Sequence, residues 1–552
     1  MKNKKMWMWK FFTYIPFLII ALIIGSIHAW LFVQEKVAPY PAPYGRATVL
    51  PQMTTDGIAA QKVGDGQFAY RTGASLTYAR IDETGLAALE TRPLPDQGLF
   101  NSYVLSSAGA VWVGDGGRLY ASEWKGGSWQ NKHTLIDPQV KGVRAAEGAD
   151  GADGAVWLAY NEQAVFVLKR TVDGAAQWSK LDIPDVSEAK ASLNNAGNLD
   201  VVYVATKEGR ASLGYVQLDK TSWRPLQQQT QLKEVELASF NHLDDFSFVR
   251  EGSTIEAAYT ISSSKSGKSS LHLLTFAADA PALSTAGVAD TQLQIPVTDA
   301  VNSDTNLEPV FHRMPSGEIQ LVVSAVYEKN RRLTSQELYA IGIQGGKPSS
   351  TMPITHAGGF AVYPTMLAVD GHTAVVWLEA AGEGEYRVNY ATDQPAYAQR
   401  MNRWTGTDYV NAIKTAPLLW GIGLLTALLS LKWIVLPTLY LLALNAFRQH
   451  HYDEHPRLHF GLSLGMYLAV KVLLLGDYRK PATLAVMPEA LRSWLVYLAI
   501  VAVIAVISYA LTRIWRKGLD ERNVGLELLY FVLLDGFMTN LWFSYFVSLA
   551  SL

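Results

Sequence analysis

The residues of this sequence best placed to do chemistry are polar side chains inside long apolar runs. They recur at intervals of four or eight, so each set lies along one face of a helix: Ser463, Tyr467 and Lys471 in one run, and Glu527, Asp535 and Thr539 in another. A lone charge at mid-bilayer costs about 2.5–3.5 kcal/mol on insertion scales. Because Lys471 and Asp535 lie at similar depths, we expect them to form an ion pair. The pair could be a clasp between helices, a handle for another membrane subunit, or a proton or ion relay.

A group of histidines lies between two apolar runs, at positions 450, 451, 455 and 459. On one continuous helix His451, His455 and His459 would share a face and could chelate a metal. Pro456 disfavours that helix, and the alternative is a set of histidines beside arginines at the level of the lipid headgroups. We expect no resident metal and no cofactor.

Carboxylates in the central region give weaker signals. Asp150 and Asp153 lie in a glycine-rich segment without a complete calcium loop, so a solvated loop is the simpler interpretation. Asp244 and Asp245 are adjacent, and a second acidic cluster near Arg387 contains Glu379, Glu383 and Glu385. Paired carboxylates can hydrolyse glycosides only at a suitable separation in space. A sequence does not give that separation, so we assign no catalytic residue.

The composition excludes several classes of protein. The 552 residues contain no cysteine, which rules out disulfides, thiolate metal sites and cysteine nucleophiles. A formal net charge of −2 gives no reason to expect nucleic acid as a partner. The apolar residues are distributed unevenly, because long apolar runs occupy both ends of the chain and residues 34–413 between them are polar and strand-like.

Five apolar runs are long enough to cross a bilayer core, which takes about 20 helical residues: 11–33, 414–447, 458–476, 490–512 and 524–549. The first follows a lysine-rich tail, residues 1–10. A signal peptide cut after Ala29 would leave Ile27 where a small residue is preferred, so we favour an uncleaved anchor. We interpret 414–447 as one long span kinked at Pro437, because halves divided at Lys432 would be too short.

The distribution of basic residues predicts the orientation of these spans. Lysines in the tail 1–10 and arginines between the later runs favour the cytoplasmic side. The N-terminus is then cytoplasmic, while residues 34–413 and the C-terminus lie outside. We therefore expect an integral protein of the cell membrane with five spans and a large extracytoplasmic domain.

The central region contains a repeat of about 45 residues. Apolar strand-like runs centred on Phe68, Val111, Val156 and Val201 are separated by 43, 45 and 45 residues, and three further runs follow at longer steps. Short strands at this period are typical of a β-propeller with about four strands in each blade. We predict an all-β propeller of six to eight blades, with seven favoured, over residues 53–400. A proline-rich linker, 34–52, would precede it, and a four-helix transmembrane domain, 414–549, would follow it.

Two hairpin sequences resemble the Asp-box, Ser/Thr-x-Asp-x-Gly-x-Thr-Trp, of sialidase-like propellers. Ser122, Gly126 and Trp129 match one copy, in which Trp124 replaces the aspartate. A second copy retains Thr171, Asp173 and Trp178 but has alanine in place of the glycine. The resemblance implies structural turns in which the tryptophan packs between blades. It maps no catalytic residue of that family onto this chain, and fold alone does not carry function.

Three functions remain open. The first is a binding or scaffolding protein of the cell envelope, whose partners would be the bilayer, other membrane or envelope proteins, or a surface polymer. The second is a membrane-bound enzyme acting on glycans or polysaccharides. The third is a subunit of a transport or sensor system that uses the intramembrane polar residues. We favour the first, because few spans without internal repeats argue against a lone carrier.

Overall fold

The computed structural model describes residues 2–549 with gaps. The residues outside this description are 38–42, 56, 97–101, 131, 137–138, 149–155, 171–175, 228, 238–239, 279–286, 299–300, 304, 331–332, 356–358, 383, 404, 412, 415–426, 481–482, 485–486 and 518–521. The chain divides into two compact units. One comprises Pro39–Tyr327 and Ser335–Arg403, and the other comprises Met1–Ala38, Glu328–Thr334 and Trp404–Leu552.

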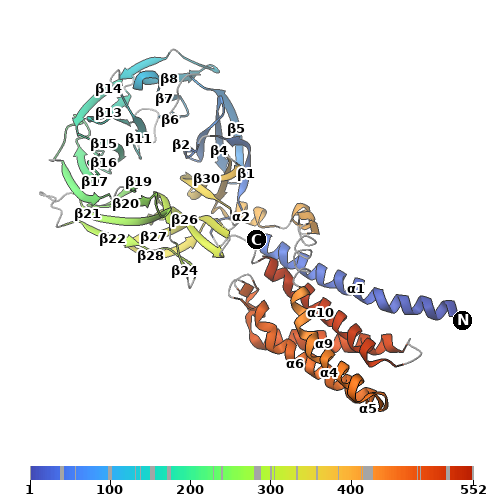
Figure 1. The fold of residues 1–552 in the computed structure, drawn as a ribbon. Coiled ribbons are helices and arrows are strands. Elements are labelled where there is room, and N and C mark those ends of the chain that lie inside the picture. Colours follow the sequence, from blue (N-terminus) through green and yellow to red (C-terminus); the bar gives the residue numbers. More distant parts are fainter. Residues whose placement is uncertain are drawn as a thin grey trace. The chain divides into compact units, whose positions relative to one another are not determined.

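The larger unit is a seven-blade β-propeller, in which the blades follow one another around a ring (Figure 1). Each blade is an antiparallel sheet of four strands, and the second blade has the extra strand β9. The first three blades are β2 (Gln61–Gly64), β3 (Gln67–Thr72), β4 (Ser75–Asp82) and β5 (Gly85–Pro93); β6 (Ser102–Ser106), β7 (Gly109–Val113), β8 (Leu119–Lys125), β9 (Ser128–Trp129) and β10 (His133–Ile136); and β11 (Gly142–Ala145), β12 (Val156–Tyr160), β13 (Ala164–Arg170) and β14 (Ala176–Asp182).

The remaining four blades have the same construction, and a short β23–β24 ribbon (Pro296–Thr298 and Val301–Asn302) stands apart from them. They are β15 (Val186–Leu193), β16 (Leu199–Lys207), β17 (Arg210–Leu218) and β18 (Thr230–Glu236); β19 (Asn241–Glu251), β20 (Thr254–Ser263), β21 (Lys268–Ala277) and β22 (Ala289–Leu293); β25 (Thr305–Arg313), β26 (Ile319–Asn330), β27 (Leu333–Gln344) and β28 (Lys347–Pro353); and β29 (Ala361–Val369), β30 (His372–Gly382), β31 (Glu385–Thr392) and β1 (Thr48–Thr54).

Each apolar run of the sequence repeat is the second strand of a blade: β3, β7, β12, β16, β20, β26 and β30. Every side chain of β7 and of β12 is buried, because neighbouring blades cover both faces of the sheet. Seven apolar clusters join successive blades, and one of them joins the first blade to the last. The predicted propeller is therefore confirmed, and it has seven blades.

The ring is closed by a strand from the start of the domain. β1 pairs antiparallel with β31, so the last blade combines one N-terminal strand with three C-terminal strands. Leu50 of β1 is buried against this blade. Residues 48–52, which the sequence placed in the linker, thus form part of the propeller. The pairing covers the edge that β31 would otherwise expose.

Glycines facing tyrosines allow close packing within two blades. Gly142 of β11 pairs with Tyr160 of β12, and Gly214 of β17 pairs with Tyr203 of β16. A Cβ atom added to Gly214 would lie 2.2 Å from Cζ of Tyr203, and one added to Gly142 would lie 2.4 Å from Oη of Tyr160. The tyrosine ring therefore occupies the space that a side chain at the glycine would need.

The smaller unit is helical: α1 (Lys2–Val37), α4 (Ala427–Phe447), α5 (Gln449–Glu454), α6 (Pro456–Leu474), α8 (Glu489–Arg492), α9 (Trp494–Arg516) and α10 (Val524–Leu549), with the short helix α2 (Pro395–Met401) belonging to the propeller unit. Among the described residues, four helices are long and apolar enough to cross a membrane: α1, α6, α9 and α10. α4 is also apolar, but its stretch Lys432–Phe447 is shorter than these four. α10 is the most buried of the four and packs against α1, α4, α6 and α9.

Two of the differences between the helix boundaries and the predicted runs bear on the predicted spans. α4 begins at Ala427, and residues 415–426 lie outside the described chain, so the single long span over 414–447 is not tested. α9 covers Trp494–Arg516 instead of 490–512, because Ser493 has an extended backbone, with φ −63° and ψ 132°, and separates it from α8. Arg513 and Arg516 therefore lie in the last turn of α9, where their positive charges interact favourably with the negative end of the helix dipole.

Candidate functional site

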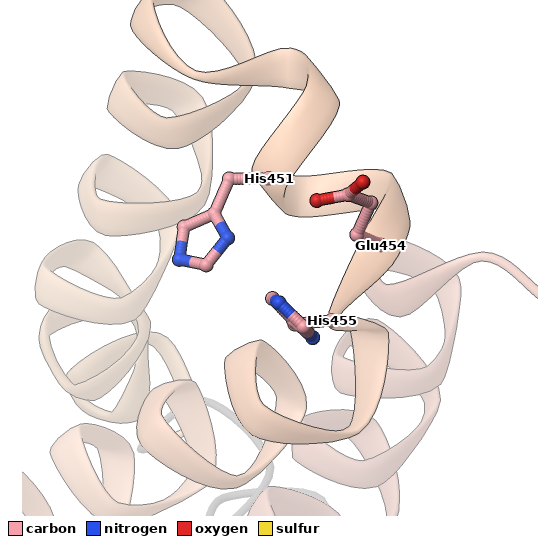
Figure 2. A group of neighbouring side chains, drawn as sticks. All are labelled: His451, Glu454 and His455. Atoms are coloured by element: carbon pink, nitrogen blue, oxygen red, sulfur yellow. The ribbon is translucent and has the colours of Figure 1, made fainter.

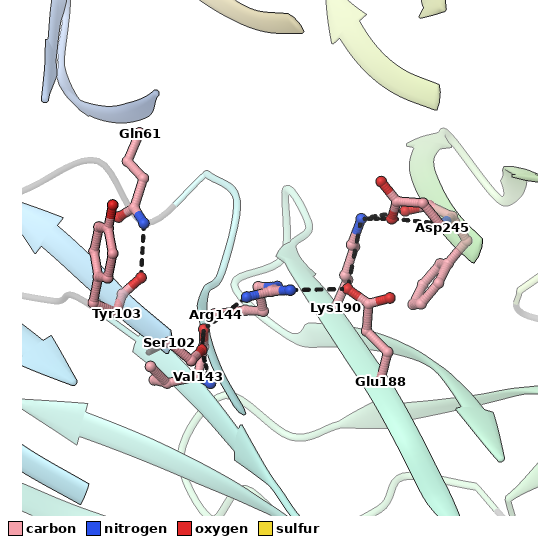
Figure 3. Close-up of polar contacts among 9 residues, drawn as sticks. Gln61, Ser102, Tyr103, Val143, Arg144, Glu188, Lys190 and Asp245 are labelled. Atoms are coloured by element: carbon pink, nitrogen blue, oxygen red, sulfur yellow. Dashed lines mark hydrogen bonds and ion pairs between the residues drawn. The ribbon is translucent and has the colours of Figure 1, made fainter. Parts of the chain in front are cut away.

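The propeller encloses a cavity of about 1530 Å³ on its axis. Its walls come mainly from the first strand of each blade, β2, β6, β11, β15, β19, β25 and β29, and from the turns next to them. Figure 3 shows part of this wall, with Gln61 of β2 donating a hydrogen bond to the Tyr103 carbonyl of β6 at 2.7 Å. Because every blade contributes to the wall, the cavity forms only when the ring closes.

A chain of ion pairs crosses three blades along this wall (Figure 3). Arg144 of β11 lies 3.3 Å from Oε1 of Glu188 of β15. Lys190, two residues further along β15 and so on the same face, lies 4.0 Å from Glu188 and 2.6 Å from Oδ1 of Asp245 of β19. Oδ1 of Asp245 also accepts a hydrogen bond from the Phe246 amide at 2.7 Å. Charges of alternating sign therefore follow one another around the cavity.

Burial and the neighbouring charges together set the pKa values along this row of ion pairs. Burial acts to lower the pKa of Lys190, but Asp245 and Glu188 outweigh it and raise that pKa above its usual value. Burial raises the pKa of Glu188, Lys190 and Arg144 oppose this, and the nearby Asp245 adds to it. Lys190 is thus held as a cation between two acids, and its ammonium also donates to the Phe246 carbonyl.

Three successive blades carry an irregularity at the same point of their first strand. The pairing register shifts between Leu243 and Phe246 in β19, between Leu307 and Val310 in β25, and between Val362 and Thr365 in β29. Bulges of this kind re-aim side chains and are common beside functional sites. Here they bring Asp244 and Asp245, Glu308, and Tyr363 to the cavity wall.

Two of the bulged residues have backbones in the left-handed region. Glu308 has φ 57° and Tyr363 has φ 54°, and each is followed by proline. A side chain in this region carries a strain of about 1–3 kcal/mol, which persists where the surrounding structure imposes it. The amide of Tyr363 donates a hydrogen bond to Oε2 of Glu308, so the two strained positions support each other across adjacent blades.

Glu308 differs chemically from the other acids of the cavity. Burial raises its pKa to about 8, the Tyr363 amide opposes this, and the charges of Asp245 and Asp244 add to it. At neutral pH Glu308 is therefore mainly a protonated carboxylic acid. His312, further along β25, has its pKa lowered to about 4 by burial and by Lys62, so it is neutral.

The acids singled out in the sequence separate into two groups. Asp244 and Asp245 reach the cavity, whereas Glu379 and Arg387 face each other across β30 and β31 and are absent from its wall. Glu379 accepts a hydrogen bond from Asn389 at 3.2 Å. Glu383, Asp150 and Asp153 lie outside the described residues.

Arg144, Glu308 and Tyr363 of the wall were not predicted from the sequence, although the repeat contained a signal for them. Together with Asp245, they each stand 12 residues before a residue in the second strand of their blade: Val156, Ala257, Gln320 and Val375. They are therefore equivalent positions of the third, fifth, sixth and seventh blades, and Ala189 holds this position in the fourth. Aligning the repeats on their second strands would have brought these four residues into one column.

The hairpins that resemble an Asp-box behave differently from each other. In the first, Ser122 donates a hydrogen bond to the Gln130 carbonyl at 2.8 Å, Gly126 has φ 61°, and Trp129 Nε1 donates to the Pro93 carbonyl of the preceding blade at 2.7 Å. This tryptophan contacts the neighbouring blade as the resemblance implies. Trp178 lies on the outermost strand β14, is 53% exposed and packs edge-on against Phe166 of its own blade.

The second hairpin cannot be compared further, since Thr171 and Asp173 fall outside the described residues. In the first, Trp124 occupies the aspartate position and packs edge-on against Trp129, with ring centroids 5.1 Å apart. An aromatic contact thus takes the place of the aspartate brace. The propeller is established by its sheets, and the Asp-box itself is not.

In the helical unit, Lys471 of α6 and Asp535 of α10 form the expected ion pair. Lys471 Nζ lies 2.6 Å from Oδ2 of Asp535, and neither side chain has any exposed surface. Tyr467 donates to the same oxygen at 2.8 Å, and Lys471 also donates to Thr539 at 2.8 Å. The ring of Trp433 lies 5.6 Å from the ammonium. Tyr467, Thr539 and Trp433 thus surround the buried pair, one from each of α6, α10 and α4.

The other two polar candidates stand apart from this cluster. Glu527, at the start of α10, pairs with Arg516 at 3.1 Å and with Arg522 at 3.2 Å. Ser463 is fully buried in α6, and among the described residues its hydroxyl has no hydrogen-bond partner. The predicted polar stripes are therefore divided into a central cluster and an end cluster.

Comparison with known proteins places the chain in no family. No protein-family model and no curated protein matches it. Solved propellers match at low similarity. A streptogramin B lyase is 12% identical with a TM-score of 0.35, over 63% of this chain and 97% of its own. Virginiamycin B lyase from Staphylococcus aureus is 13% identical with a TM-score of 0.36, over 63% and 99%.

The WD40 domain of SCAP from fission yeast is 11% identical with a TM-score of 0.32, over 65% of this chain and all of that domain. Since these proteins include both lyases and a WD40 domain, and the similarity is low, we take no activity from them. The seven-blade assignment rests on the pairing of the strands.

Proposed function

We propose that this chain is a membrane-anchored binding protein, a scaffolding component of a cell-envelope complex, whose propeller receives a polar ligand in its axial cavity. The observation that carries the proposal is the chain of ion pairs from Arg144 to Asp245, which presents both signs of charge around one cavity. Alternating charges beside tyrosines and amides suit a polar segment of a polypeptide or a surface polymer better than a small apolar molecule.

The orientation predicted from the basic residues belongs to the proposal. The propeller lies outside the cytoplasmic membrane, held by α1 and by the C-terminal helices. Protease added to intact cells should then cut the propeller, and broken cells should show the same fragments. Protection of the propeller in intact cells would reverse the orientation and with it the ligands available to the cavity.

The binding test compares two lysine variants in native membranes. Cross-linking, solubilisation of the full chain and identification of what co-purifies should give a defined partner or polymer for the wild type. Lys190→Met leaves Asp245 without its cationic partner and Glu188 with Arg144 alone. It should reduce recovery of that partner about tenfold or more, as expected when a charged group is removed from a binding surface of alternating charges. Lys347→Met, on the exposed outermost strand β28, should leave it unchanged. Equal recovery from both variants would refute a role for the cavity.

A second candidate function is favoured by one observation. Glu308, whose pKa burial raises to about 8, lies near a second acidic side chain, Asp245. A pair of acidic side chains, one with a raised pKa, is the arrangement that glycoside-processing enzymes use. Release of reducing sugar from envelope polysaccharide by the purified chain, abolished in Glu308→Gln, would establish an enzyme. Binding of the polysaccharide without turnover would leave the chain a binding protein.

A further inference from the structure

The connection between α4 and α6 brings together two histidines and a glutamate that the proposed function does not use. α5 ends at Glu454, His455 separates the helices, and Pro456 begins α6. One ring nitrogen each of His451 and His455 and a carboxylate oxygen of Glu454 all lie within 4.8 Å of one another. Figure 2 shows the three side chains grouped around the turn between the helices.

The backbone explains why these side chains meet although Pro456 interrupts the helix. The break is confined to His455, with φ −122° and ψ 51°. The amide of His455 donates to the His451 carbonyl at 3.2 Å, and the amide of His459 donates to the His455 carbonyl at 3.2 Å. The four-residue spacing of a helix thus continues across the break, because proline in the first turn needs no N–H donor.

His459 orients the group without joining it. It is buried, and its Nε2 lies 3.3 Å from the His451 carbonyl oxygen. A carbonyl only accepts hydrogen bonds, so Nε2 is the donor to it, and Nδ1 forms a hydrogen bond with the Tyr440 hydroxyl at 2.8 Å. The ring centroids of His459 and His451 are 5.1 Å apart. Both nitrogens of His459 are therefore occupied, and the residue holds His451 in place.

We propose that His451, Glu454 and His455 bind one divalent transition-metal cation of the zinc class. Imidazole nitrogens with a carboxylate oxygen form a donor set that zinc accepts, at metal–ligand distances of about 2.0–2.2 Å. Tetrahedral geometry at those distances separates the donor atoms by about 3.4 Å. Rotation of the exposed Glu454 and His455 side chains toward the half-buried His451 closes the present spacing. Three protein ligands leave a fourth position for water. Two imidazoles disfavour calcium and magnesium, which prefer oxygen ligands.

A neighbouring histidine supplies the matched control. His450 is adjacent in sequence and lies almost fully exposed, and its Nε2 is 3.1 Å from Oε1 of Glu454. It does not belong to the group of three donors. Its replacement removes an imidazole from the same helix while leaving every proposed ligand, so nonspecific chelation by histidines is separated from binding at the site.

The test measures metal binding by the full chain in detergent after removal of any affinity tag and treatment with a chelator. Equilibrium dialysis against Zn²⁺ should give one bound metal per chain, and Co²⁺ in its place should show the absorption of a four-coordinate site. His451→Gln and His455→Gln should each weaken Zn²⁺ binding by more than about 100-fold. His459→Gln should weaken it by about 10–100-fold, which is the range for residues that only orient a metal ligand. His450→Gln should keep the stoichiometry and affinity.

Glu454→Gln, an isosteric change on the surface, keeps the test decisive if a histidine variant fails to fold. It should weaken Zn²⁺ binding while thermal unfolding in the presence of chelator stays at the wild-type temperature. No bound metal in the wild type, or undiminished binding in a His451→Gln/His455→Gln double variant, would overturn the proposal. Loss of binding in His450→Gln equal to that in His451→Gln would also overturn it, since it would indicate nonspecific chelation.

Discussion

Replacement of Glu308 by glutamine gives a sharp test of the cavity's electrostatics. The pKa of Glu308 is raised from 4.5 to about 8 in the folded protein. Between these two pH values the folded protein keeps a proton on Glu308 that the unfolded chain has released. Stability linked to this group is therefore fully present below about pH 4.5 and declines as the pH rises through about 8. Glutamine stays neutral and can still accept the hydrogen bond from the Tyr363 amide. Glu308→Gln should therefore remove this decline.

The magnitude follows from the two pKa values. The interval from 4.5 to about 8, at about 1.36 kcal/mol for each pH unit, sets a ceiling of about 5 kcal/mol. Glu308 is half-buried and faces a cavity open to water, so solvent screening reduces the expected difference to about 1–2 kcal/mol. For a domain of this size the corresponding change in Tm is about 2 °C.

The assay is thermal unfolding of the solubilised full chain, followed by tryptophan fluorescence between pH 5 and pH 9. Wild type should lose stability relative to Glu308→Gln as the pH rises, and the two should converge at pH 5. Glu385→Gln, an exposed acid on β31, serves as the control and should parallel the wild type. Identical pH profiles for wild type and Glu308→Gln would refute the assignment of a neutral acid in the cavity.

Two further substitutions test the packing of each unit. Asp535→Asn leaves Lys471 buried without its counter-charge and should destabilise the helical unit by about 3–5 kcal/mol, measured as lost abundance in membranes, whereas a Lys471→Met/Asp535→Leu double variant should recover most of it if the pair is structural. Normal abundance of the single variant would contradict the clasp. Gly214→Ala places a methyl group against Tyr203 and should lower propeller stability by about 1–3 kcal/mol in thermal unfolding. Gly382→Ala, with open space around its Cβ, should not, and equal effects would show that the contact is unimportant.

Part of the intramembrane site followed from the sequence. Helical periodicity and the cost of a charge in lipid brought Lys471 and Asp535 together, because a fixed helical spacing turns sequence position into depth. The same argument could not separate Glu527, which pairs with arginines at the helix end. Arg516 and Arg522 flank the turn between α9 and α10, and whether they reach Glu527 depends on where the chain turns. The apolar pattern does not locate that turn to within a few residues.

The histidine group shows the opposite difficulty. The sequence indicated that Pro456 would break the shared helical face, and the helix does break there. The hydrogen bonds that bridge His455 nevertheless keep His451 and His455 together, with ring centroids 4.9 Å apart. A proline's effect depends on whether it falls in the first turn of a new helix or in the interior of an old one, and the fold decides between these.

By itself the sequence determined the architecture, because both signals for it are local. A strand covered on both faces must be apolar throughout, so each blade leaves one recognisable run, and a span of lipid requires a continuous apolar helix. The cavity was decided only by the tertiary structure. Arg144, Lys190, Asp245 and Glu308 are separated by 46, 55 and 63 residues, and ring closure with the strand bulges makes them neighbours. Charge, burial and proton affinity at that wall arise from contacts between blades, which no single repeat contains.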